Sequence, residues 1–259
     1  MQPQILKLNF LLLSFDFMKV DAINLPGDTT KNIDYIKLSQ DFIYAAKTGD
    51  TTSGYIDLLS RANEDTLANQ LNNDNARLAF WLNCYNAYTQ VILKENPEKY
   101  TSRSLFFKSK QINIAGHLIS LDKIEHGILR HSKIKWSLGY LNKWFPGSFE
   151  KKFRVQHLDY RIHFALNCGA KSCPPIAFYN PDQIDRQLKL ATANYLSSEA
   201  SYDSAKNTLY LPALMNWFRR DFGGKQKMKE LAKTVGLVPT SANPVIKFNK
   251  YDWELFLSK

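Results

Sequence analysis

A long apolar stretch lies in the first half of the chain and reads Leu78-Ala79-Phe80-Trp81-Leu82-Asn83-Cys84-Tyr85-Asn86-Ala87-Tyr88-Thr89-Gln90-Val91-Ile92-Leu93. Its aromatic, leucine and alanine side chains cover nearly every face of one helix, which is typical of a central, buried helix. We expect this helix to run from Arg77 to about Glu95, after a cap at Asp74 or Asn75 and before Pro97.

One polar stripe interrupts the helix and consists of Asn83, Asn86 and Gln90. Buried amides are nearly always hydrogen-bonded, so two interpretations stay open. Either the amides satisfy the backbone of a loop that packs against the helix, or Asn83 or Asn86 lies beside a catalytic centre. In the second case the amide orients a catalytic base or binds an oxyanion.

Outward from this helix, the periodicity predicts an α+β fold, a helix-dominated single domain with a small β-sheet. Two or three amphipathic helices are expected between residues 35 and 71. The other predicted elements are a strand–turn–strand over 111–119, a helix from 120 to about 131, short helical pieces in loops over 132–155, a buried strand over 161–166, a helix over 180–197, a strand over 208–211, and helices over 214–222 and 225–235.

Length and composition bound the domain organisation and the partners. The chain has 259 residues, 44% of them hydrophobic, and we expect one globular domain over residues 33–259. Residues 1–32 read as a signal remnant or an N-terminal extension, with an apolar run that Asp16 interrupts and that is too short to span a bilayer. No integral membrane span is therefore expected. The net charge is +10, but the basic residues are dispersed and no nucleic-acid-binding motif appears, so we expect no nucleic-acid partner.

Cys168 is the strongest candidate for a nucleophile, because it follows the predicted buried strand and precedes Gly169. Thiolates are favoured in electropositive, partly exposed settings, above all next to a histidine. Cys173 is a second catalytic thiol, a disulfide partner of Cys168 or a packing residue. Cys84 in the central helix reads as a small buried hydrophobe.

His126 is the candidate base. It follows Glu125 and shares a helix face with Arg130, four residues later. A carboxylate can hold the tautomer of a histidine, although neighbouring residues on a helix point about 100° apart, so Glu125 is not expected to be its direct partner. His163 alternates with apolar residues and is either a substrate-binding residue or a satisfied core histidine.

Cofactor chemistry is not predicted. The chain has no phosphate-binding loop, no dinucleotide fingerprint and no GxSxG motif. A metal site built from His126, His163, Cys168 and Cys173 ranks low, because their intervals match no tight ligand pair. We expect no cofactor and no metal.

Three ordered motifs resemble the domain of unknown function 547 family, which occurs in bacteria, plants and some animals. They are Phe80-Trp81-Leu82-Asn83-Cys84-Tyr85-Asn86, Glu125-His126-Gly127-Ile128-Leu129-Arg130 and His163-Phe164-Ala165-Leu166-Asn167-Cys168-Gly169. The segments Trp217-Phe218, Asp221-Phe222-Gly223 and Tyr251-Asp252-Trp253 are also similar, so that the resemblance runs from about residue 40 to the end. It implies a bacterial member of a family without an established activity. It also favours Cys168 over Cys173 as nucleophile, because plant members often carry serine at the second position.

Two functions follow from these residues. In the first, the protein is a thiol-dependent hydrolase or acyltransferase acting on a small-molecule or peptide substrate. Cys168 attacks a carbonyl, His126 is the base, and Asn83 or Asn86 orients it. Arg130 binds a substrate carboxylate, and the other expected substrate-binding residues are Glu125, His163 and Cys173. In the second, it is a non-catalytic interaction or scaffold domain whose motifs form a structural hydrogen-bond network. Because many bacterial relatives look exported, a periplasmic or extracytoplasmic location is slightly favoured over a cytoplasmic one.

Overall fold

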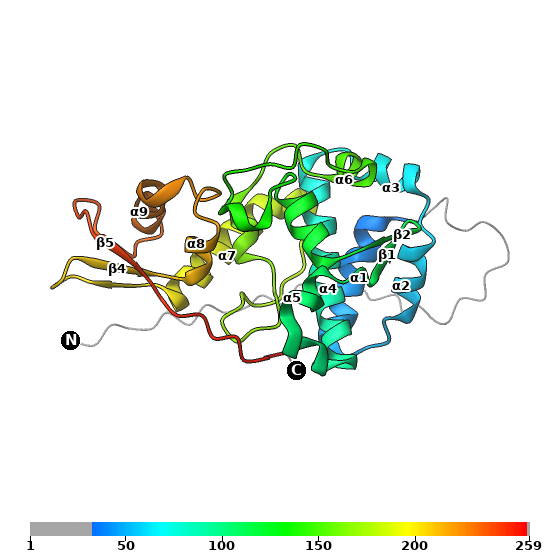
Figure 1. Ribbon diagram of the computed structural model, residues 1–259, viewed down its shortest axis with the longest axis horizontal. Coiled ribbons are helices and arrows are strands. Elements are labelled where there is room, and N and C mark those ends of the chain that lie inside the picture. Colours follow the sequence, from blue (N-terminus) through cyan, green and yellow to red (C-terminus); the bar gives the residue numbers. More distant parts are fainter. Residues whose placement is uncertain (1–32, 258–259) are drawn as a thin grey trace.

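The computed structural model describes residues 33–257, and the predicted signal remnant or extension lies outside them (Figure 1). Helix α4, Asp74–Glu95, runs through the body of the molecule with nearly all its side chains buried, as the apolar pattern predicts. Its cap is Asn73, one residue before the predicted candidates, and the Asn73 side chain accepts a hydrogen bond from the Ala76 amide. Asp74 instead accepts from the backbone amides of Gln156 and His157.

Helices packed around α4 form the first half of the molecule. The predicted two or three helices before α4 are three, and α1 packs along α4. These elements are α1 (Tyr35–Thr48), α2 (Ser53–Ser60) and α3 (Glu64–Gln70) before α4, and η2 (Pro97–Ser102) and α5 (Arg103–Lys108) after it.

The predicted strand–turn–strand is confirmed as a hairpin of β1 (Ile112–Ile114) and β2 (His117–Ile119). The strands pair antiparallel, with Ile112 opposite Ile119. The next predicted helix contains η3 (Lys123–Leu129), which has the wide turns of a π-helix. Two short pieces, η4 (Lys135–Ser137) and α6 (Ser148–Phe153), lie in the loops that follow.

The prediction of a buried strand over residues 161–166 is wrong. It lies in η5 (Tyr160–Phe164), a 3-10 helix whose cap, Asp159, accepts from the Arg161 amide. Backbone bonds such as Ala165 N to Ile162 O continue the turn. A short helix buried on all sides gives the same apolar run as a buried strand, so periodicity alone does not separate them.

The C-terminal half combines helices with a three-stranded sheet. In that sheet β3 pairs antiparallel with β4, and β5 pairs parallel with β4. The elements are η6 (Pro181–Gln183), α7 (Ile184–Glu199), β3 (Ser201–Asp203), β4 (Thr208–Leu211), α8 (Ala213–Trp217), α9 (Gly224–Thr234) and β5 (Val245–Phe248). The molecule is therefore helix-dominated α+β with two small sheets, and over residues 33–257 no helix is long and apolar enough to cross a membrane.

Two apolar clusters form the core, one around α4 and one between α7, α9 and the three-stranded sheet. After β5 the chain turns back from the second cluster to the first, as the red segment in Figure 1 shows. There Phe256 N donates to Gly169 O and Lys171 N donates to Glu254 O, both at 2.8 Å. This returning segment, residues 249–257, is called the C-terminal tail below, and it fastens the loop that carries Cys168.

Candidate functional site

The π-helical turns of η3 place the Glu125-His126 pair and Arg130 at the boundary between the two apolar clusters. The backbone amide of Arg130 donates to Glu125 O, five residues earlier, at 2.8 Å, and this spacing is that of a π-helix. Arg130 Nη1 donates to His126 Nδ1 at 2.9 Å, so the predicted i, i+4 contact is present. His126 Nδ1 therefore acts as an acceptor, as in a neutral imidazole.

A buried charged cluster forms around Arg130. Its Nε donates to Asp221 Oδ2 at 2.7 Å, and both side chains are fully buried. His163 Nε2 donates to the same oxygen at 2.9 Å. The Phe218 ring stacks on His163, with 3.8 Å between centroids, and the Arg130 guanidinium lies 4.5 Å from it. One carboxylate thus joins η3 and η5 to the turn after α8.

Burial and neighbouring charge set the protonation states of this cluster. Burial, with the positive charge of Arg130, lowers the pKa of His126 well below its usual value. Burial also lowers the pKa of His163, to about 4, although its bond to Asp221 opposes that shift. Burial alone would raise the pKa of Asp221, but the bonds from His163 and Arg130 hold it below its ordinary value. At neutral pH the cluster is a buried ion pair with two neutral imidazoles.

Glu125 is a buried carboxyl of this region whose pKa lies near neutrality. Burial raises its pKa to about 7, which the positive charge of Arg130 only partly opposes. The Tyr85 hydroxyl lies 3.4 Å from Glu125 Oε2. A buried carboxyl with a perturbed pKa is a common mark of functional sites, although structural networks produce it too.

The amides of α4 hold the backbone of two loops. Asn83 forms two hydrogen bonds with the Tyr179 backbone, from Tyr179 N to Oδ1 at 2.8 Å and from Nδ2 to Tyr179 O at 3.0 Å, and its Nδ2 also donates to Ser39 Oγ at 3.1 Å. Asn86 Nδ2 donates to Ala165 O at 2.9 Å, and its Oδ1 accepts from Asn167 N at 2.8 Å. The first of the two interpretations of the polar stripe is therefore the one that these contacts favour.

Cys168 and Cys173 are joined in a disulfide. The hydroxyl of Tyr251, in the C-terminal tail, lies 3.2 Å from the Cys168 sulfur and 3.1 Å from the Cys173 sulfur. Cys168 is half-buried and follows the 3-10 helix η5 rather than a strand. Cys84 is fully buried, and burial raises the pKa of its thiol, as expected of a packing residue.

Comparison with protein families places the three motifs in one segment. A family model described as "Protein of unknown function, DUF547" matches residues 68–196. This match supports membership of the DUF547 family. The DUF547 match includes α4, η3 and the Cys168 loop, but it ends before Asp221 and Tyr251. Searches of curated proteins and of solved structures found no match.

The DUF547 segment brings its predicted site residues together in two groups rather than one. His126, Glu125, Arg130 and His163 gather at the buried cluster, whereas Cys168 and Cys173 contact Tyr251. Within residues 33–257, hydrogen bonds to the two sulfurs come from Tyr251 and from the Cys168 amide, not from an imidazole. The catalytic roles assigned to these residues stay predictions.

Sequence reasoning did not select Asp221, Phe218 or Tyr251 as site candidates. Phe218 and Asp221 lie in a turn, and Asp221 is 91 residues from Arg130 along the chain. Tyr251 lies in the C-terminal tail. The Asp221-Phe222-Gly223 segment in the family resemblance was the available signal.

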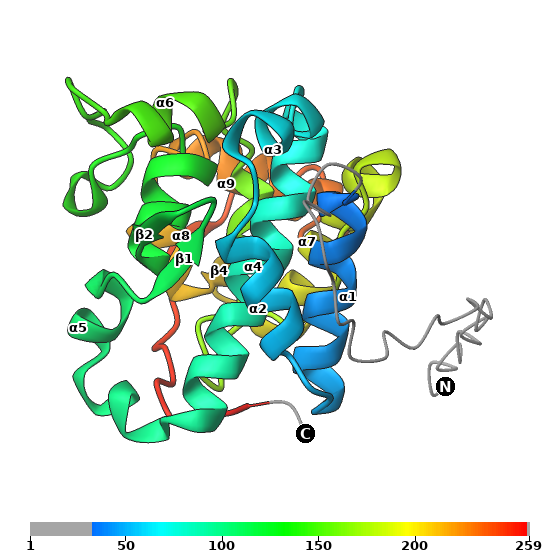
Figure 2. The ribbon, with the colours of Figure 1, turned by 90° about the vertical axis from the view of Figure 1, so that its right-hand side faces the viewer.

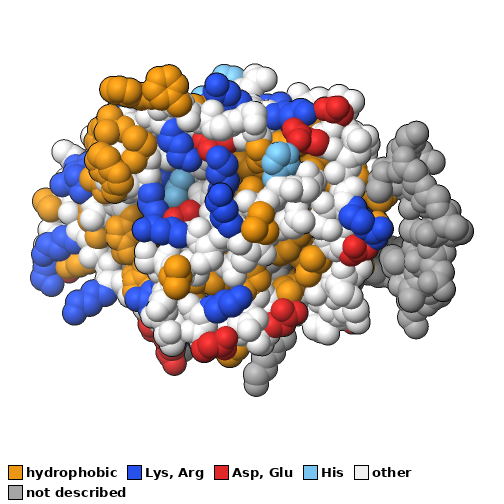
Figure 3. All heavy atoms as spheres, turned by 45° about the vertical axis from the view of Figure 1, so that its right-hand side comes forward, with side chains coloured by type: hydrophobic (Ala, Val, Ile, Leu, Met, Phe, Trp, Pro, Cys, Tyr) orange, Lys and Arg blue, Asp and Glu red, His pale blue; other side chains and the backbone are white. Residues whose placement is uncertain are grey.

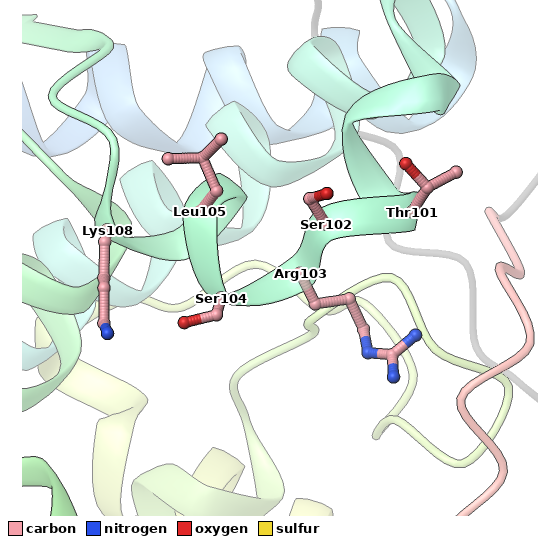
Figure 4. A pocket seen from close by; sticks show the side chains of 6 residues that line it. All are labelled: Thr101, Ser102, Arg103, Ser104, Leu105 and Lys108. Carbon is pink, nitrogen blue, oxygen red and sulfur yellow. The ribbon is translucent and has the colours of Figure 1, made fainter.

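An open surface pocket lies apart from the two groups, on η2 and α5. It is lined by Thr101, Ser102, Arg103, Ser104, Leu105 and Lys108 (Figure 4). The Arg103 guanidinium lies 4.9 Å from the ring of Trp253 in the C-terminal tail. The pocket contains none of the predicted site residues.

Proposed function

We propose that the chain is a non-catalytic interaction domain, in which the Asn, His and Cys motifs hold the fold together. The proposal rests on the hydrogen bonds of Asn83 and Asn86, each of which donates from its side-chain nitrogen to loop backbone and accepts from loop backbone at its side-chain oxygen. An amide engaged in this way is held by the fold rather than directed at a substrate or a catalytic base. Buried amides bonded in this way rigidify a core and make its packing unique.

The charged cluster supports the same function. Arg130, which the catalytic hypothesis assigns to a substrate carboxylate, is fully buried and bonded to Asp221. His163 shares that carboxylate, and His126 accepts from the arginine. These contacts join segments from both apolar clusters, which is the role expected of a buried polar network that specifies one arrangement of elements.

A thiol-dependent hydrolase or acyltransferase is the second candidate, and one observation favours it. Both cysteines are half-buried residues, and both sulfurs lie within hydrogen-bond distance of the Tyr251 hydroxyl. A thiol reductant would first have to open the disulfide. The Cys168 thiolate would then attack a carbonyl, form a thioester and release an alcohol or amine, and water would hydrolyse the thioester.

Alkylation with iodoacetamide, followed by mass mapping, separates the two candidates. The interaction function predicts no labelling of Cys168 or Cys173 in the unreduced protein, and labelling with an apparent pKa of about 8.5 after reduction by a phosphine. Cys84 serves as the internal control, because it is buried and should react only on unfolding. An apparent pKa well below that of an ordinary thiol, which returns to normal in His126→Ala, would contradict the interaction function and support the hydrolase.

A further inference from the structure

An aromatic loop projects from the body of the molecule between η3 and α6. Residues 133–147 contain two tryptophans, a tyrosine, a phenylalanine and three lysines, and no acidic residue. Trp136, Trp144 and Phe145 are 76%, 89% and 91% exposed, and Leu138, Tyr140 and Leu141 are exposed as well. Figure 2 shows the chain before α6 standing out from the helices, and Figure 3 shows hydrophobic side chains gathered on that side of the molecule, bordered by basic ones.

Backbone and side-chain hydrogen bonds hold this loop in one shape. Ile134 N donates to Leu141 O, Lys143 N donates to Ser132 O, and Ser137 Oγ accepts from Leu141 N. These bonds define the path of the loop backbone, and the apolar side chains that it carries are exposed. A contiguous exposed apolar surface of this kind marks an interaction site.

The loop is also anchored to the charged cluster. Arg220 N donates to Leu138 O at 3.0 Å, and Gly139 packs against Asp221 so closely that a Cβ at Gly139 would lie 2.1 Å from Asp221 Oδ1. Gly139 has a φ of +89°, a conformation that glycine adopts without strain. The buried network thus supports the base of the exposed loop.

The charge around the loop identifies the partner that it fits. Lys135 and Lys143 are paired with Asp122 and Glu150, whereas the exposed Arg220 has its guanidinium 5.9 Å from the Tyr140 ring. Lys151 adds an exposed positive charge on α6. Tryptophan and tyrosine favour the interface of a bilayer, because one part of each ring system is apolar and another is polar. Basic residues next to them add attraction to anionic lipid headgroups.

We propose that residues 133–147 dock this chain onto an anionic membrane surface, with Trp144 and Phe145 inserted among the lipids. This inference rests on the interaction function proposed above and names its partner. A convex loop suits a bilayer, which accepts a projecting side chain, better than a peptide, which needs a groove. The net charge of +10 would raise the rate of encounter with such a surface.

Sedimentation with phosphatidylcholine vesicles, with and without phosphatidylglycerol, tests the proposal. The wild-type protein should bind the anionic vesicles, and Trp144→Ala/Phe145→Ala should lower the partition coefficient roughly tenfold or more. The matched control is Phe178→Ala/Leu190→Ala, which also removes two exposed apolar side chains but lies outside the loop, and it should bind as the wild type does. Unchanged thermal unfolding of both variants shows that each is folded.

The other outcomes overturn the proposal in distinct ways. Absence of wild-type binding, or equal binding of the wild type and the loop variant, excludes insertion of the loop. A wild-type dimer that the loop variant converts to a monomer, without vesicle binding, assigns the loop to a second copy of the chain. The interaction function itself would survive each of these results if alkylation shows ordinary thiols at Cys168 and Cys173.

Discussion

At the scale of single residues, Glu125 has an unusual electrostatic position. It lies next to a histidine that is held neutral, and it titrates near the pH at which most carboxyls are fully ionised. The sequence shows the Glu125-His126 pair but not this property, because it depends on burial. The sequence also did not show that Asp221 is the partner of Arg130, because Asp221 is 91 residues away and lies in a turn without periodicity.

Glu125→Gln should change the dependence of stability on pH. The folded-state pKa of Glu125, about 7, exceeds its ordinary value of 4.5, so its contribution to stability is fully present below pH 4.5 and is lost as pH rises through 7. Glutamine cannot ionise, so the free energy of unfolding of the variant should exceed that of the wild type by about 1–3 kcal/mol near pH 8. This difference should shrink toward about pH 5. Urea unfolding at both values measures it, with the exposed Glu254→Gln as control.

A difference between Glu125→Gln and the wild type that stays constant across this range would show that Glu125 does not titrate there. His163 does not affect the comparison, because both proteins contain it. Since its pKa is lowered to about 4, its contribution to stability is lost as pH falls from 6.5 through about 4, whereas that of Glu125 is lost as pH rises.

At the scale of elements, α4 organises the first half of the molecule through two kinds of contact. Its aromatic and aliphatic faces pack against α1 and its other neighbours, and its amides hold the loops around residues 165–167 and 179. The apolar pattern predicted the first kind correctly. It left the second open, because spacing shows that amides share a face but not which backbone they meet.

Asn86→Ala should lower the free energy of unfolding by about 2–3 kcal/mol, because it leaves the buried Ala165 carbonyl and Asn167 amide without their partner. Asn194→Ala is the matched control, since Asn194 is exposed on α7, and it should change stability by less than about 0.5 kcal/mol. Equal stability of the two variants in urea would show that the amide contacts do not support the loop.

The prediction over residues 161–166 failed at the same scale for a physical reason. A sequence distinguishes the period of a strand from that of a helix only when one face of the element is polar. Here Ile162, Phe164 and Ala165 are all buried, so the pattern has no polar face. The signal that favoured a helix was Asp159, whose side chain caps the turn. The hairpin over 111–119, with its Ala115-Gly116 turn, had no such ambiguity.

At the scale of the whole molecule, two apolar clusters depend on each other through polar contacts. Asp221 joins the second cluster to η3, and the C-terminal tail joins it to the Cys168 loop. The sequence predicts a single domain over residues 33–259 because it contains no linker. It could not show that the core is divided, since both halves have similar apolar patterns.

Thermal unfolding should occur in one cooperative transition, because loss of either cluster would leave Arg130 or Asp221 buried without its partner. Scanning calorimetry measures this, and the calorimetric and van't Hoff enthalpies should agree. Two resolved transitions would mean that the clusters are separate folding units and that the single-domain prediction is wrong.

The C-terminal tail also has a consequence for the order of events during synthesis. Tyr251 follows Cys168 by 83 residues, so at roughly 5–20 residues per second the ribosome makes it several seconds after the cysteine. During that interval the nascent Cys168 loop lacks the C-terminal tail that later contacts it. Until Tyr251 has been made, its hydroxyl cannot contact the two sulfurs, so any oxidation of Cys168 and Cys173 within that interval takes place without the tail.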